Sequence, residues 1–223
     1  MGEETKPQKR RKKPLVVIGT IVVVVALLGV GFFVWHNQPS FCNAICHVPM
    51  DPDLPTYEAT PGHPAIDKRG REVADAAGMM AAVHRVAGET AGKKIDCLAC
   101  HVPTISQQIE EGIAWISGKY VVFDNATYGG ILSEHTLAEL AVARGVEGDA
   151  FCLNPDCHDM TRDDLAQLTA QYTINPHAPQ HGDIYCDLCH KAHRASTNYC
   201  SQCHKDTPIP EGWLSYQEFQ ALQ

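Results

Sequence analysis

The ten cysteines of this chain fall into five close pairs, and a histidine follows the second cysteine of every pair. The pairs are Cys42 and Cys46, Cys97 and Cys100, Cys152 and Cys157, Cys186 and Cys189, and Cys200 and Cys203, followed by His47, His101, His158, His190 and His204. No cysteine is left over, and only 12 of the 223 residues are histidine. Chance does not produce this arrangement, so the sequence predicts one chemical function repeated in five places.

Three of the groups match C-x-x-C-H, the signature of covalent haem c attachment. Two thiols bond to the porphyrin, which fixes it over the adjacent imidazole so that this ring ligates the iron. The groups at 42–47 and 152–158 have three and four residues between their cysteines, so the extra residues must loop away from the porphyrin edge. Asn154, Pro155 and Asp156 are turn-forming residues that suit such a loop. The sequence therefore predicts five covalently bound haem c groups, each with an iron.

Two other kinds of site also use paired cysteines. Zinc takes four ligands per ion and gives no reason for a histidine after every pair. Five local disulfides would account for the cysteines and leave the histidines unexplained. Haem attachment is therefore favoured over a zinc or disulfide protein.

Histidines outside the motifs are the candidates for the second axial ligand of each iron, because low-potential haems take two imidazoles. His193 is the strongest candidate, since the short run CDLCHKAH tethers it close to the last two motifs. His84, His135 and one of the pair His177 and His181 come next, with His63 ranked lower. At the first haem, the run CNAICHVPM leaves either His47 or Met50 as the iron ligand.

An uncharged run of 21 residues, 15–35, follows a basic tail at residues 1–14. As a helix it would be about 31 Å long, close to the thickness of the hydrocarbon core of a bilayer. The run is too long for a signal peptide, no A-x-A cleavage pattern follows it, and the basic tail should stay in the cytoplasm. We therefore expect a single helix that crosses the cytoplasmic membrane of a bacterium and contacts its lipid. Residues 36–223 would then form one extracytoplasmic haem domain.

Composition limits the fold and the partners of that domain. The tail holds six of the 18 basic residues and two of the 26 acidic ones, which leaves 12 basic and 24 acidic residues after it. Phosphate binding needs a basic face, so nucleic acid is excluded as a partner. Aromatic residues make up 7% of the chain, so its hydrophobic core should be thin and the haems should fill the interior. Helical patterns predict a mainly α fold with long loops, with helices over 71–89, 104–120, 133–145 and, after a capping box at Thr161 and Asp164, 162–172.

Residues 15–204 resemble the NapC/NirT/NrfH family of membrane-anchored multihaem cytochromes. The resemblance rests on the order of a signal-anchor helix, a haem motif soon after it, CLACHVP and CDLCHKAH. It implies oxidation of a quinol such as menaquinol at the outer face of the membrane, and transfer of the electrons to a separate extracytoplasmic reductase. The order is also similar to that of small cytochromes that serve flavin-dependent reductases, such as cardiac glycoside reductase.

The chain departs from this family in two places. It has five motifs where family members commonly have four, and Met50 stands one position later than the family's methionine. The family also places a lysine and a carboxylate near the quinol, in the helix after the second haem. Glu111, Lys119 and Asp124 are the matching candidates here for handling the quinol protons.

Two functions remain open on the sequence. The first is an electron-transfer protein with quinol dehydrogenase activity. The alternative is a terminal reductase that acts on a small substrate at an open haem iron, which would need a pocket with polar catalytic groups. The number of spare histidines counts against many open irons. No G-x-G-x-x-G flavin fingerprint is present, so the final substrate is expected to be reduced on another polypeptide.

Overall fold

The computed structural model describes residues 13–46, 52–119 and 135–222. Its helices are α1 (Lys13–His36), α2 (Pro39–Phe41), α3 (Leu54–Glu58), α4 (Met80–Thr90), α5 (Cys97–Cys100), α6 (Ile105–Ser117), α7 (Leu137–Arg144), α8 (Arg162–Leu168), α9 (Cys186–Cys189) and α10 (Tyr216–Ala221). A π-helix covers Cys42–Cys46, and 3-10 turns cover Ala76–Gly78, Gly148–Phe151 and Tyr199–Gln202. The strands are β1 (Ala65–Ile66) and β2 (Glu72–Val73), which pair antiparallel, and β3 (Thr197–Asn198) and β4 (Leu214–Ser215), which pair in parallel. This confirms the mainly helical fold class.

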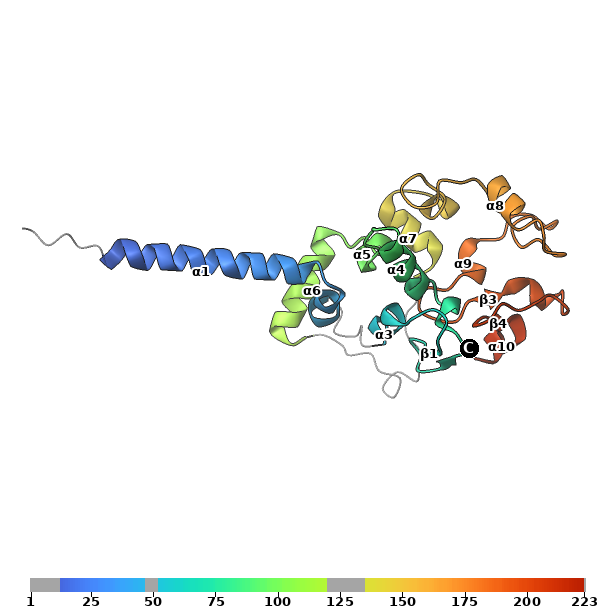
Figure 1. Ribbon diagram of the computed structural model, residues 1–223, viewed down its shortest axis with the longest axis horizontal. Coiled ribbons are helices and arrows are strands. Elements are labelled where there is room, and N and C mark those ends of the chain that lie inside the picture. Colours follow the sequence, from blue (N-terminus) through green and yellow to red (C-terminus); the bar gives the residue numbers. More distant parts are fainter. Residues whose placement is uncertain (1–12, 47–51, 120–134, 223) are drawn as a thin grey trace, which may run out of the picture.

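Helix α1 projects from the rest of the molecule as a single rod (Figure 1). It is the N-terminal apolar helix that the sequence predicts, and its side chains are exposed along its length. By length and composition Pro14–His36 is able to cross a membrane, a property that N-terminal signal sequences share. Phe41 packs against the last turn of α1, with its ring 5.0 Å from Trp35 and 4.7 Å from His36. These aromatic contacts join α1 to the short helix α2 that leads into the first cysteine motif.

Apart from Phe41, the buried apolar side chains of the described residues form two small clusters. One consists of Val73, Ala76, Met79, Ala82 and Ala195, and the other of Leu137, Ala141 and Phe151. The second cluster packs against Cys152 and Cys186, which belong to different motifs. The core is therefore as thin as the composition predicts, and cysteine side chains share in it.

Segment 191–196 joins parts of the chain that are far apart in sequence. The backbone amides of Met80 and Ala81, at the start of α4, donate to the carbonyls of Lys191 and Ala192. The amide of Lys68 donates to the carbonyl of His193 at 3.0 Å. Ser196 pairs with Gly78 on one side and Leu214 on the other, so segment 191–196 lies between the N-terminal half of the domain and its C-terminal strand.

The helix predicted over 71–89 begins only at Met80, and this part of the prediction is wrong. Glu72 and Val73 pair with β1 instead, and the Asp75 carboxylate accepts hydrogen bonds from the amides of Gly62 and Ala77. These tertiary hydrogen bonds replace the helical ones before Met80. The helices predicted over 104–120, 133–145 and 162–172 are present but shorter, the last ending at Leu168, and the capping box of Thr161 and Asp164 is confirmed.

Gly212 provides a test of this arrangement, because the chain approaches Asp75 closely there. Its φ is +76°, and a Cβ atom at this position would lie 2.3 Å from the Asp75 carbonyl oxygen. Gly92 is a matched control, with φ +67° and no atom within 4 Å of such a Cβ. We expect Gly92→Ala to lower the free energy of unfolding by about 1 kcal/mol through backbone strain alone. Gly212→Ala should lower it by clearly more, as measured by thermal unfolding of the haem-loaded chain, and equal losses would contradict the close approach.

Candidate haem sites

Four of the five motifs lie within the described residues in full, and each is closed by the same backbone hydrogen bond. In the three motifs of standard spacing the histidine amide donates to the carbonyl of the first cysteine. The distances are 2.8 Å for His101 to Cys97, 2.9 Å for His190 to Cys186 and 2.8 Å for His204 to Cys200. In the third motif the amide of His158 donates to the carbonyl of Cys152 at 3.2 Å, across two additional residues. The wider spacing therefore keeps the closure of the ordinary motif.

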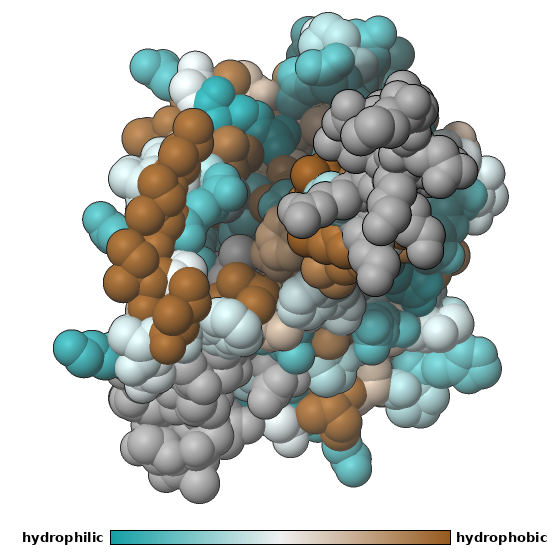
Figure 2. All heavy atoms as spheres, turned by 90° about the vertical axis from the view of Figure 1, so that its left-hand side faces the viewer, coloured by the Kyte–Doolittle hydropathy of each residue, from teal (hydrophilic) through white to brown (hydrophobic). Residues whose placement is uncertain are grey.

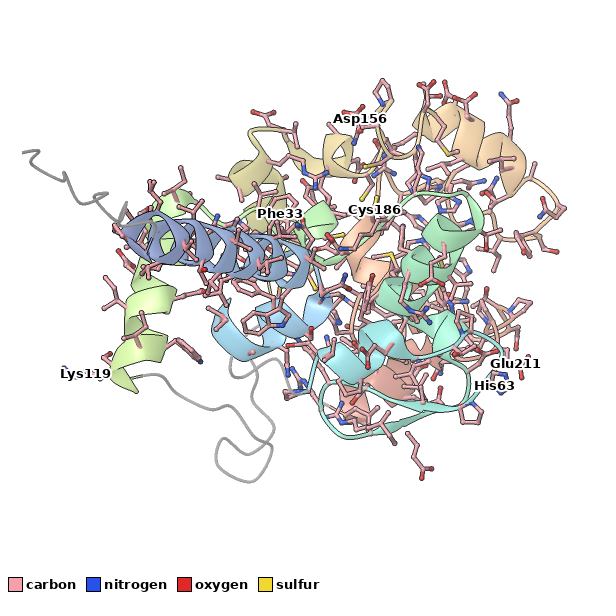
Figure 3. The ribbon with its side chains drawn as sticks, turned by 60° about the vertical axis from the view of Figure 1, so that its left-hand side comes forward. Phe33, His63, Lys119, Asp156, Cys186 and Glu211 are labelled. Atoms are coloured by element: carbon pink, nitrogen blue, oxygen red, sulfur yellow. The ribbon has the colours of Figure 1, made fainter. Side chains whose placement is uncertain are left out.

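The side chain of Asn154 folds the additional residues of the third motif into a loop. Its Oδ1 accepts hydrogen bonds from the amides of Asp156 and Cys157, and its Nδ2 donates to the carbonyls of Ala150 and Phe151. Asp156 lies exposed at the outside of this loop (Figure 3). The extra residues thus bulge outward, as the turn chemistry of the sequence predicts.

The first motif accommodates its single extra residue in another way. Residues Cys42–Cys46 form a π-helix, whose turn is one residue longer than that of an α-helix. Two of the standard motifs form one α-helical turn, α5 and α9, and the third standard motif begins in the 3-10 turn Tyr199–Gln202. His47 and Met50, the two candidate ligands for the first iron, lie outside the described residues.

Cysteines of consecutive motifs lie beside one another. Cys42 and Cys97 share a thiol–thiol hydrogen bond, which lowers the pKa of Cys42 to about 7 and raises the pKa of Cys97. A hydrogen bond between Cys186 and Cys152 lowers the pKa of Cys152 and raises that of Cys186.

Hydrogen bonds and packing connect the remaining motifs. The Arg144 guanidinium donates to the Ala99 carbonyl of the second motif and lies 4.0 Å from Sγ of Cys157 in the third, and α9 of the fourth motif packs against β3, which precedes the fifth. The five motifs therefore follow one another in space in the same order as in the sequence.

The histidines that follow the cysteine pairs face histidines from outside the motifs. Ring centroids are 5.9 Å apart for His84 and His158, 6.4 Å for His177 and His190, and 6.0 Å for His181 and His204. Two imidazoles that bind opposite sides of one metal ion through nitrogen, at about 2 Å each, have centroids about 6 Å apart. The spacing of these pairs therefore fits one iron between each pair of rings.

Two histidines compete for the place opposite His101. The centroid of His135 is 6.1 Å from His101 with the rings inclined by 63°, whereas that of His193 is 6.4 Å away with the rings inclined by 23°. The His135 side chain is 65% exposed and that of His193 is 19% exposed. The sequence places His193 near the last two motifs, but the structure brings it beside the second motif instead. Segment 191–196, held by hydrogen bonds to α4 and its surroundings, produces this placement.

Hydrogen bonds at Nδ1 set the tautomer of three of these outer histidines. The Nδ1 atom of His84 lies 2.8 Å from the Met80 carbonyl oxygen, which only accepts, so Nδ1 carries the proton. The hydroxyl of Thr56 donates to the Asp53 carbonyl and lies 2.6 Å from Nδ1 of His193, so it accepts the proton of that ring.

Thr169 holds His177 in the same manner. Its hydroxyl lies 2.8 Å from the Leu165 carbonyl oxygen and 2.6 Å from Oδ1 of Asn175, both of which only accept, and 3.2 Å from Nδ1 of His177. The hydroxyl proton therefore goes to an acceptor, and Nδ1 of His177 is the donor. Each of the three rings then presents an unprotonated Nε2, the form in which histidine binds a metal. Thr56 and Thr169 carry no signal in the sequence that links them to a haem.

Burial keeps both imidazoles of the fourth site, His190 and His177, neutral. It lowers the pKa of His190 to about 4, with further contributions from His177, His84 and His158. Burial also lowers the pKa of His177. A histidine must be neutral to ligate a metal, so these shifts suit axial ligands. They also place the third and fourth pairs close enough to interact.

The two competing kinds of site receive no support from the described residues. The nine cysteines whose side chains are described are all free thiols, so none of them forms a disulfide. No group of three or more His, Cys, Asp or Glu side chains in the described part of the chain is arranged to hold a metal ion by itself. The histidines occur in facing pairs, which is the arrangement that suits a porphyrin iron.

Two of the three predicted proton-handling residues lie within the described part of the chain, at different positions along and beyond α6. Glu111 lies half-buried in the middle of α6, and α6 packs against the first motif. Lys119 lies beyond the C-terminal end of α6 and points away from the molecule (Figure 3). Asp124 lies outside the described residues. His63, ranked low as a ligand, is exposed at the surface (Figure 3).

These motifs and facing histidines define the class of protein as a multihaem c-type cytochrome. A family model described as cytochrome c3 matches residues 135–205, which include the third, fourth and fifth motifs. The chain is 49% identical over 216 residues to the cytochrome c-type protein Cgr1 of Eggerthella lenta, an alignment that covers 97% of this chain and 94% of the relative. The chain therefore belongs to the Cgr1 family of c-type cytochromes. No solved structure matches it.

The loop of the third motif can be tested at Asn154. Replacement by alanine removes all four hydrogen bonds of this side chain, so Asn154→Ala should lower haem attachment at that motif. The measurement is the intact mass of the mature chain, in which a population that lacks one haem should appear. Asp156→Ala is the matched control, because its exposed side chain makes none of these bonds, and full attachment is expected there. Equal haem loss in both variants would contradict the role of Asn154.

Proposed function

We propose that this chain is a membrane-anchored cytochrome with five haem c groups that carries electrons from a quinol to a separate reductase outside the cytoplasm. This is the function that the resemblance to the NapC/NirT/NrfH family implies. The observation that carries the proposal is the ordered series of motifs that begins beside the end of α1. A haem bound at each motif would supply an iron that takes up and releases one electron. The intact mass of the mature chain tests the number of haems.

The proposed topology gives the series a direction. With α1 as the membrane anchor, the first motif follows it by a few residues and stands at the outer surface of the bilayer. The fifth motif, which begins directly after β3, lies at the other end of the molecule (Figure 1). Electrons would enter near the membrane and leave at the far end. The electron acceptor is proposed to be a flavin-dependent extracytoplasmic reductase.

In this proposal the outer histidines hold the irons from the second side. His84 would pair with His158, His177 with His190, and His181 with His204. For His101 we propose His193, because its ring is better buried, more nearly parallel and fixed at Nδ1 by Thr56. His135 is the competing ligand for this iron.

A cavity at the base of α1 supports a quinol site. Its volume is ≈ 320 Å³, and it is lined by Gln38, Pro39, Tyr57, Glu58, Arg85, Glu89, Lys94 and Ile95. Gln38 and Pro39 directly follow α1, so the cavity would open at the level where a quinol head leaves the lipid. The second motif is adjacent, because the hydroxyl of Tyr57 donates to the carbonyl of Ile95, two residues before Cys97.

The cavity also provides acid–base groups for quinol oxidation, which releases protons together with electrons. The Glu89 carboxylate, paired with Arg85 at 2.9 Å, is the proposed proton acceptor. Tyr57 donates its hydroxyl proton to the Ile95 carbonyl at 2.9 Å and shapes the wall of the cavity. Glu111, Lys119 and Asp124 remain proposed proton carriers between this region and the solvent.

The ligand of the second iron is tested by removing each competing histidine. We expect His193→Ala to convert one haem per chain to a high-spin spectrum, since one axial position loses its imidazole. His135→Ala should leave the spectrum unchanged. Thr56→Val should give a partial change, because the ring of His193 loses the group that holds Nδ1. Haem content by intact mass is the control, and a high-spin signal in His135→Ala alone would reverse the assignment.

The quinol reaction is tested by following haem reduction after menaquinol is added to the reconstituted chain. We expect Glu89→Gln to slow this reduction by about 100-fold, the usual contribution of a proton acceptor, and to leave reduction by dithionite unchanged. Glu110→Gln is the control on the exposed side of α6. The opposite result would be slow haem reduction by menaquinol in Glu111→Gln, Lys119→Ala or Asp124→Asn and normal reduction in Glu89→Gln. That result would place the proton acceptor on α6 or in the residues that follow it. A wild-type chain with intact haems that menaquinol does not reduce would contradict the function.

A further inference from the structure

Helix α6 turns its apolar side away from the protein. Ile105, Ile109, Ile113 and Ile116 recur at helical spacing on one face, and they are 57–79% exposed. On the other side of the helix Glu111 and Ala114 are half-buried. A surface helix of a globular protein shows the opposite arrangement, with its apolar face toward the core. We call these four isoleucines the isoleucine stripe.

The isoleucine stripe faces the side of the molecule from which α1 projects. Helix α6 runs across the direction of α1, and it packs against the π-helix Cys42–Cys46 that follows α1 and α2 (Figure 1). Seen along α1, a column of apolar side chains over α6 faces the viewer beside the exposed apolar surface of α1 (Figure 2). The two apolar surfaces would therefore meet the same environment.

We infer that α6 lies flat in the outer interface of the membrane, with the isoleucine stripe in contact with lipid. This goes beyond the proposed function and rests only on the part of it that makes α1 a membrane anchor. With 13 residues α6 is about 20 Å long, enough for the stripe to extend along three turns. Trp115, 42% exposed near the C-terminal end of α6, is a residue type enriched at the level of the lipid headgroups.

The charges of α6 indicate how it binds the membrane. Helix Ile105–Ser117 contains Glu110 and Glu111 and no lysine or arginine. Interfacial helices that bind through electrostatics carry basic residues on their polar face. Burial of the isoleucine stripe must therefore provide the binding, and anionic lipid should not strengthen it.

A lipid surface explains the stripe better than a second copy of the chain does. A partner copy seated on the stripe would occupy the side of the molecule from which α1 projects, where the proposed bilayer lies. The same bilayer would also bury the apolar surface of α1. Contact through both α1 and α6 would fix the tilt of the haem domain and hold the first motif at one height above the lipid.

The inference is tested by photocrosslinking in the full-length haem-loaded chain. The photoreactive residue p-benzoylphenylalanine replaces Ile113 in one variant and Glu110 in a matched control on the exposed polar flank of α6, about 100° around the helix from the middle of the stripe. A third variant carries it at Val23 in α1, as a positive control for insertion. The chains are reconstituted in vesicles of phosphatidylcholine alone and in vesicles that also contain phosphatidylglycerol, and adducts are identified by mass spectrometry.

We expect lipid adducts at Ile113 and Val23, only background at Glu110, and equal yields in the two kinds of vesicle. Adducts at Val23 without any at Ile113 would overturn the inference and leave α1 as an anchor. Adducts at Ile113 to a second copy of the chain would also overturn it. A yield at Ile113 that requires phosphatidylglycerol would contradict binding through apolar burial. If no lipid adducts formed at Val23 either, the proposal that α1 is a membrane anchor would be wrong.

Discussion

The rest of this structure depends on one constraint, that pairs of histidine rings must face each other across the interior. The described part of the chain buries two small apolar clusters, and a core of that size does little to offset the entropy of an ordered chain. Pairs such as His84 with His158 and His101 with His193 join segments that are distant in sequence. With an iron between the rings, each pair becomes a cross-link. Folding and haem attachment would then be one process, in the way that metal binding and folding are coupled in small metal-binding domains.

Segment 191–196 shows how the backbone meets this constraint at two sites at once. His190 faces His177 at the fourth motif, and three residues later His193 faces His101 at the second. Hydrogen bonds from Lys68, Met80 and Ala81 hold the intervening backbone. The orientation of the two rings relative to each other is therefore fixed. Trp213 adds a contact with the ring of His190 at 5.2 Å. Through Trp213 the C-terminal segment therefore supports the fourth site.

Three features on the side of the domain next to α1 suit the proposed membrane topology. In that proposal helix α1 would span the membrane, the isoleucine stripe of α6 would face lipid, and the cavity lined by Gln38 and Pro39 would lie close to both the membrane and the second motif. Beyond the basic tail the chain has twice as many acidic as basic residues, so the domain as a whole would suit a partner with a basic docking face. Such attraction weakens as salt rises.

Sequence alone determined the chemistry of this protein, because a covalent attachment motif is local. The five Cys-His groups, the apolar helix, the mainly helical class and the outward loop at Asn154 all follow from neighbouring residues. Only the tertiary structure decided which histidine faces which motif. His193 lies beside the second motif because of backbone hydrogen bonds to α4, and Thr56 fixes its tautomer from 137 residues away. The same holds for the start of α4 at Met80 and for the outward face of α6. Local propensity gave a helix in both places, but strand pairing and tertiary contacts decided where α4 begins and which side of α6 is left exposed.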